Sequence, residues 1–182
     1  MITKRWRLLV VVLLLVALVG IGWLGYRELA TPQVVSLQCE SGDGGRPQFV
    51  VSAHRVNGIQ SFMFWSDTKA EPRWAFRIGP TRVSPEDLPR FRYGELPLVP
   101  DPQLRRTTQV FPRKGAPRAI APGEKFYVWV LYQYDQAFPP VPCGGWGYFL
   151  FEMRPDGSAT PLDPAGPIEM PKSVEEVSAM MW

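Results

Sequence analysis

The chain opens with an unbroken apolar run from Leu8 to Val19, which continues to Leu24 and follows a cluster of basic residues. A helix over residues 8–26 would be about 28 Å long at 1.5 Å per residue. The hydrocarbon core of a bilayer is about 30 Å thick, so one helix of this length fits it with little tilt. The pattern therefore predicts a single transmembrane helix over residues 8–26.

Charge on the two sides of this run predicts its orientation. Lys4, Arg5 and Arg7 precede it, whereas Arg27 and Glu28 cancel each other after it. Basic residues that flank a transmembrane helix tend to stay on the cytoplasmic side. We therefore expect an inner (cytoplasmic) membrane protein with residues 1–7 in the cytoplasm and residues 27–33 as a linker. Residues 34–182 would form a periplasmic or extracellular domain.

A cleaved signal peptide is the alternative interpretation of this segment, because a short apolar core behind a basic start also has that form. Cleavage after Gly22 would leave Trp23 as the first residue. Cleavage after Ala30 would place Glu28 at the minus-three position, which should be small and neutral. We therefore expect a signal anchor that remains on the mature protein.

Beyond the linker, apolar residues recur with the period of two that is typical of β-strands. Both faces of Ile59–Trp65 and of Phe126–Tyr134 are largely apolar, which predicts strands that are covered on both sides. In the first of these strands one face is expected to hold Ile59, Ser61, Met63 and Trp65, and the other Gln60, Phe62 and Phe64. Trp74–Ile78 has the pattern of a half-buried strand. Further strands are expected at Val34–Cys39, Phe49–Val56, Thr107–Phe111 and Tyr148–Met153.

Other segments have weaker or different patterns. Prolines recur through residues 79–123 and favour extended, irregular chain over the interior of a sheet. Ser173, with Glu176 three residues later, fits a capping box and predicts a short helix toward Trp182. The predicted fold class is mainly β, with an N-terminal transmembrane helix followed by one antiparallel β-sandwich domain and a short C-terminal helix.

Composition limits the number of domains and the kinds of partner. Residues 31–182 carry 16 basic and 16 acidic residues, because four of the 20 basic residues and one of the 17 acidic residues lie before them. A neutral domain lacks the basic footprint of a nucleic-acid-binding protein, so nucleic acid is not expected as a partner. About 150 residues suffice for one domain with its own core.

The stretch APGEKFYVWVL at Ala121–Leu131 resembles the proline-glycine turn and following strand of immunoglobulin-like and fibronectin-like sandwich domains. Together with RYGELP at Arg92–Pro97 and the late strand GWGYFLFEM, it is similar to uncharacterised envelope-anchored proteins with one small sandwich domain. The resemblance implies a sandwich fold and a place in the cell envelope. It implies no catalytic residues.

The two cysteines, Cys39 and Cys143, both follow the predicted membrane helix. In an oxidising compartment two such thiols can form a disulfide, which would tie the first strand to a late one. We therefore expect a Cys39–Cys143 bond. The alternative, a thiol nucleophile, would have only His54 as an imidazole base.

Two groups of residues are candidates for surface contacts. Aromatic residues make up 13% of the chain, and exposed rings can bind sugars, peptides or proteins. The candidates for a ligand or partner contact are Trp146, which lies among glycines, with Trp65 and Trp74. A basic surface that could meet anionic lipid or an acidic partner is expected at Arg105, Arg106, Arg113 and Lys114.

Reaction motifs are missing from the sequence. It has no metalloprotease helix motif, phosphate-binding glycine loop or nucleophile elbow, and His54 is its single histidine. Asp67 and Glu71 could act as the carboxylate pair of a hydrolase, although a turn explains them more simply. We expect no catalytic residues, cofactor or metal ion.

The sequence thus predicts a non-enzymatic interaction or structural module of the cell envelope. Its expected partners are the lipid bilayer and an envelope protein. A glycan-binding or peptide-binding domain that uses exposed rings is the first alternative, and a hydrolase with the carboxylate pair is the second.

Overall fold

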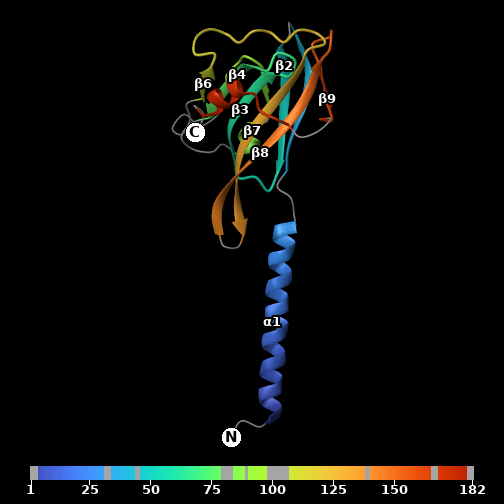
Figure 1. The fold of residues 1–182 in the computed structure, drawn as a ribbon. Helices are drawn as coiled ribbons and strands as arrows, with labels where there is room; N and C mark the ends of the chain where they lie inside the picture. The colour runs from blue at the N-terminus through green and yellow to red at the C-terminus, as the bar shows by residue number, and fades with distance from the viewer. Residues whose placement is uncertain are drawn as a thin grey trace. The chain divides into compact units, whose positions relative to one another are not determined.

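The N-terminal part of the chain is one long helix. The computed structural model describes residues 4–30, 34–43, 46–78, 84–88, 90–97, 107–137, 140–164 and 168–179. Helix α1 covers Lys4–Ala30 (Figure 1). Its segment Leu9–Tyr26 has a mean hydropathy of 2.6, and none of that segment is buried inside the structure. By length and composition, α1 can therefore cross a membrane.

The chain divides into two compact units, of which one contains α1 with residues 136–141 and the other contains residues 33–135 and 142–182. The β-rich part of the chain contains two antiparallel sheets, most of which lie in the second unit, called here the β-rich unit. The three-stranded sheet has the order β1 (Val34–Asp43), β2 (Arg46–His54) and β5 (Arg90–Arg92). The six-stranded sheet has the order β6 (Thr107–Phe111), β4 (Glu71–Ile78), β3 (Gly58–Ser66), β7 (Lys125–Ala137), β8 (Pro140–Met153) and β9 (Ala159–Leu162). Two short helices, η1 (Pro85–Asp87) and α2 (Lys172–Ala179), accompany the sheets. The prediction of a mainly β fold is confirmed.

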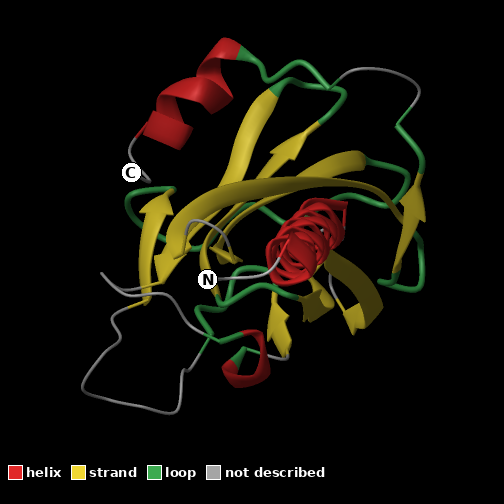
Figure 2. Ribbon diagram, turned by 90° about the horizontal axis from the view of Figure 1, so that it is seen from below, coloured by secondary structure: helices red, strands yellow, loops and turns green. Residues whose placement is uncertain are grey.

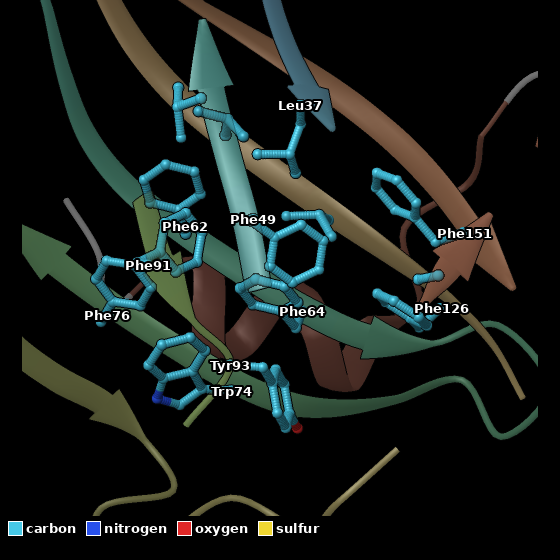
Figure 3. Close-up of a cluster of buried hydrophobic side chains, with 14 of the residues drawn as sticks. Leu37, Phe49, Phe62, Phe64, Trp74, Phe76, Phe91, Tyr93, Phe126 and Phe151 are labelled. Carbon is cyan, nitrogen blue, oxygen red and sulfur yellow. The ribbon is translucent and has the colours of Figure 1, made fainter. Parts of the chain in front are cut away.

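The two sheets share one aromatic core, with Phe49 of β2 at its centre (Figure 3). Its ring centroid lies 5.6 Å from that of Phe91 in the same sheet. It also lies 5.4 Å from Phe64 and 5.6 Å from Phe151 of the six-stranded sheet. Each such ring contributes about 2–3 kcal/mol through removal of its surface from water. This first core therefore holds the two sheets together.

Helix α2 packs on the opposite face of the six-stranded sheet (Figure 2). Val174 and Val177 of α2 are buried in a second core with Trp65, Trp129 and Leu131 of the sheet. The central strands β3 and β7 are thus covered on both sides. This arrangement agrees with the two apolar faces that their sequences predict.

Two sequence predictions about individual residues need correction. Ile59 belongs to the first core and not to the face of Met63 and Trp65. The pairing of β3 with β7 shifts register between Ile59 and Ser61, and a bulge of this kind turns a side chain to the other face. Ser173 does not begin α2, because the helix starts at Lys172. Its hydroxyl instead donates to the carbonyl oxygen of Ala70 at 2.8 Å.

The limits of some strands also differ from the prediction. Strand β8 begins at Pro140, eight residues before the predicted start at Tyr148. Strands β5 and β9 were not expected from the sequence, and with three and four residues they are too short to show a clear alternation.

Candidate functional site

The predicted disulfide is not formed, and both cysteines are thiols. Cys39 lies beside β9, where its sulfur accepts a hydrogen bond from Ala159 N–H at 3.2 Å. Ala159 pairs with Met153, which lies ten residues along β8 from Cys143. Ten residues of strand cover about 33 Å. A disulfide needs Cα atoms within about 7 Å, so these two cysteines cannot form one in this fold.

The thiol of Cys39 is also poorly placed to act as a nucleophile. Burial raises the pKa of Cys39 to about 11, which keeps the thiol protonated at neutral pH. The pairing of β1 with β2 sets Cys39 opposite Phe49, five residues along β2 from His54. Five residues of strand span about 17 Å, so the imidazole is too far away to act as its base.

The three candidate tryptophans differ in their exposure to solvent. Trp65 and Trp74 are 1% and 0% exposed and belong to the second and first core, so their rings are not surface rings. Trp74 uses its ring N–H internally, as a donor to Gln109 Oε1 at 3.2 Å. Trp146 of β8 is 59% exposed. It is therefore the one of these three rings that solvent or a partner can reach.

The candidate basic surface is described only in part. Arg105 and Arg106 lie outside the described residues. Arg113 and Lys114 follow β6 and are exposed. The structure thus places two of the four cations at the surface and leaves the grouping of all four as a prediction.

The two candidate carboxylates, Asp67 and Glu71, have different surroundings. Asp67 is exposed in the turn between β3 and β4. Glu71 lies 3.3 Å from the guanidinium of Arg73, measured from Oε1 to Nη1. Glu71 thus has a structural role as an ion-pair partner of Arg73, whose side chain is only 4% exposed. The structure therefore gives no support to acid catalysis by this pair.

Arg73 is the centre of a buried polar network that the sequence did not reveal. Its side chain is only 4% exposed and forms an ion pair with Glu124, which is 11% exposed. Glu124 also accepts hydrogen bonds from the backbone N–H of Ala121 at 3.1 Å and from the side chain of Ser66. The Nε of Arg73 has no hydrogen-bond partner among the described residues. The network joins the start of β4 to the turn before β7.

The ionisable groups in and beside this network have protonation states that suit a structural role and not acid–base catalysis. Burial alone would raise the pKa of Glu124, but the hydrogen bonds from Ala121, Ser66 and Arg73 outweigh it and leave the pKa below its ordinary value. Burial raises the pKa of the nearby Tyr93, whose hydroxyl donates to the carbonyl oxygen of Arg118 at 3.0 Å. Glu124 is therefore ionised and Tyr93 neutral at physiological pH. Neither group has a pKa near 7, which a general acid or base requires.

Two surface hollows complete the candidates. One, of about 560 Å³, lies along β5 and is lined by Arg90, Arg92, Glu95 and Leu96 among others. The other, of about 600 Å³, lies between the turn at Gly123 and strands β8 and β9. Neither is lined by a histidine or a cysteine. In the described part of the chain no three His, Cys, Asp or Glu residues are grouped as a metal site would require.

Comparisons with known proteins add no assignment. No protein-family model, no curated protein and no solved structure matches this chain. The function must therefore be inferred from the fold and from the residues described above.

Proposed function

We propose that this chain is a single-pass membrane protein that holds a non-enzymatic β-sandwich module on the outer side of the inner membrane. The observation that carries the proposal is α1. None of its apolar segment Leu9–Tyr26 is buried in the structure, and an unburied helix of this hydropathy is stable only where lipid or another apolar partner surrounds it. The basic residues Lys4, Arg5 and Arg7 support a cytoplasmic N-terminus.

The β-rich unit supports the second half of the proposal. Two sheets that pack on a shared aromatic core support the assignment of a sandwich, and sandwich domains are common interaction modules. The ionisable groups of its buried network are paired with one another, as in a scaffold. The proposed partners are the lipid bilayer and an envelope protein.

Paired fusions to the C-terminus test the orientation. A reporter enzyme that folds only outside the cytoplasm should be active, and a reporter restricted to the cytoplasm should be inactive. A matched variant with Lys4→Glu, Arg5→Glu and Arg7→Glu should weaken or reverse this pattern, because it removes the charge bias. Activity of the cytoplasmic reporter in the wild-type fusion would contradict the proposed orientation.

A ligand-binding domain remains the second candidate because Trp146 presents an exposed ring. Sugar-binding platforms normally combine more than one ring, and Trp65 and Trp74 are buried. Saturable quenching of tryptophan fluorescence by a soluble glycan or peptide, lost in Trp146→Phe, would favour this candidate over the scaffold.

A further inference from the structure

Exposed apolar side chains are few in the β-rich unit. Among its described residues the large hydrophobic side chains that are exposed are Val34, Leu96 and Trp146, at 45%, 38% and 59%. Two of these three, Val34 and Trp146, come from strands whose pairing places them toward the same end of the unit, although β8 continues six residues beyond Trp146, to Pro140. That end is also the one at which the chain enters from α1.

Strand register establishes this shared end. Val34, the first residue of β1, pairs with His54 at the end of β2. Four residues later β3 begins at Gly58, which pairs with Gln133 of β7. The next residue back along β7, Tyr132, lies against Gly145 of β8, where an added Cβ would come within 2.6 Å of the tyrosine ring. Trp146 follows directly in β8.

Trp146 lies on the same face of β8 as residues that pack in the second core, but it is not itself covered. Side chains two residues apart lie on the same face of a strand, so Trp146 shares a face with Tyr148. Tyr148 packs against the second core, and its ring lies 6.0 Å from that of Trp65. The second core includes buried residues of α2, whereas Trp146 is left mostly exposed. The uncovered part of this face therefore lies toward the end that holds Val34.

Chain length limits the distance of this end from a membrane that contains α1. Helix α1 ends at Ala30 and β1 begins at Val34, so four Cα–Cα steps separate them. At most about 3.5 Å per step, Val34 lies within about 14 Å of the helix end. The β2–β3 turn at the same end carries exposed His54 and Arg55, and the segment 54–58 contains no acidic residue. Basic side chains suit a surface of lipid phosphates.

We propose that the Trp146 end of the β-rich unit is a second membrane contact, with the indole of Trp146 in the interfacial layer of the bilayer that α1 crosses. The proposal rests on the proposed function, because it requires α1 to be in the membrane. Tryptophan favours this layer since its ring is apolar and its N–H can still reach water or a headgroup. The contact restricts the tilt of the module and turns its far end, at the β3–β4 turn, away from the lipid.

Quenching of tryptophan fluorescence by brominated lipid tests the contact in the full chain. The protein is reconstituted in vesicles of phosphatidylcholine that carries bromine atoms near the top of the acyl chains. A background variant with Trp6→Phe and Trp23→Phe removes the tryptophans of α1. We expect brominated lipid to reduce the emission of this background, and Trp146→Phe within it to abolish most of that reduction.

A matched control places a tryptophan at the opposite end. Lys69 is exposed in the turn that follows Ser66, and Ser66 pairs with Phe126 at the far end of β7. Lys69→Trp, added to the background with Trp146→Phe, should restore emission that the brominated lipid does not quench. Equal quenching at both ends would overturn the proposal, because the unit would then meet lipid without a preferred face.

The wild-type protein separates the two proposals. Suppose that brominated lipid quenches the wild-type emission, but that Trp146→Phe leaves the quenching of the background variant unchanged. Then α1 is in the bilayer and the second contact is refuted. If neither the wild-type protein nor the background is quenched, α1 is not in the bilayer, and both proposals are refuted. Trp146 is exposed, so its replacement by Phe is not expected to disturb folding.

Discussion

Glu124→Gln should destabilise the β-rich unit because it removes the buried partner of Arg73. The Arg73 side chain is 4% exposed and, among the described residues, would keep Glu71 as its ion-pair partner, whose side chain is 44% exposed and partly screened by water. Removing one member of a buried ion pair costs about 3–5 kcal/mol. The remaining contact with Glu71 places the expected loss at the lower end, about 3 kcal/mol.

The loss of unfolding free energy in Glu124→Gln comes from the unpaired charge of Arg73 that remains buried. Replacing both partners, as in Arg73→Met with Glu124→Gln, leaves no buried ion and should recover much of the loss. The double-mutant cycle should therefore give a coupling energy of about 2 kcal/mol. Glu95→Gln is the matched control, because Glu95 pairs with Arg92 at 3.9 Å with both side chains exposed. Such a surface pair contributes under about 1 kcal/mol.

Urea unfolding of the full chain in a mild detergent measures these differences. Tryptophan emission reports the β-rich unit, since Trp65, Trp74 and Trp129 are buried in its two cores. The free energy of unfolding follows from the midpoint and the slope of the transition. A Glu124→Gln variant as stable as Glu95→Gln would refute the reasoning, because Arg73 would then need no buried partner.

The remaining predictions concern pH, packing and the thiols. The pKa of Glu124 is lower in the folded chain than its ordinary value of 4.5, so its contribution is complete above that pH and is lost as the pH falls through the folded pKa. Urea midpoints should drop below pH 4.5 in the wild type and less steeply in Glu124→Gln. Gly145→Ala should lower the melting temperature through its clash with a tyrosine ring, whereas Gly144→Ala, with open space around it, should not. Unreduced, denatured protein should label at both Cys39 and Cys143, and its melting temperature should not depend on reductant.

Local alternation predicted the strands better than any other feature of the sequence. The prediction for Thr107–Phe111 matches β6 at both ends, and the two apolar faces of Phe126–Tyr134 correspond to the two cores that β7 separates. Alternation fails where the backbone departs from regular pairing, as at the bulge between Ile59 and Ser61. It also cannot identify strands as short as β5 and β9.

Contacts between residues that are far apart in the chain could not be predicted from the sequence. Arg73 and Glu124 are 51 residues apart, and nothing in their local patterns shows that they meet. The same limit explains the disulfide, since composition and compartment favour the bond but only the register of β8 and β9 shows how far apart the thiols are. The glycines around Trp146 did indicate an exposed ring, whereas Trp65 and Trp74 lie in alternating strands whose packing buries them.

Protease accessibility in sealed spheroplasts tests the central claim most directly, that one N-terminal helix holds a β-rich module outside the cytoplasm. The full chain with an epitope at its C-terminus is treated with a protease that cannot cross the membrane, and a cytoplasmic protein serves as the control for integrity. The account predicts that the epitope is lost while the cytoplasmic control stays intact. Protection of the epitope until the membrane is dissolved would contradict it.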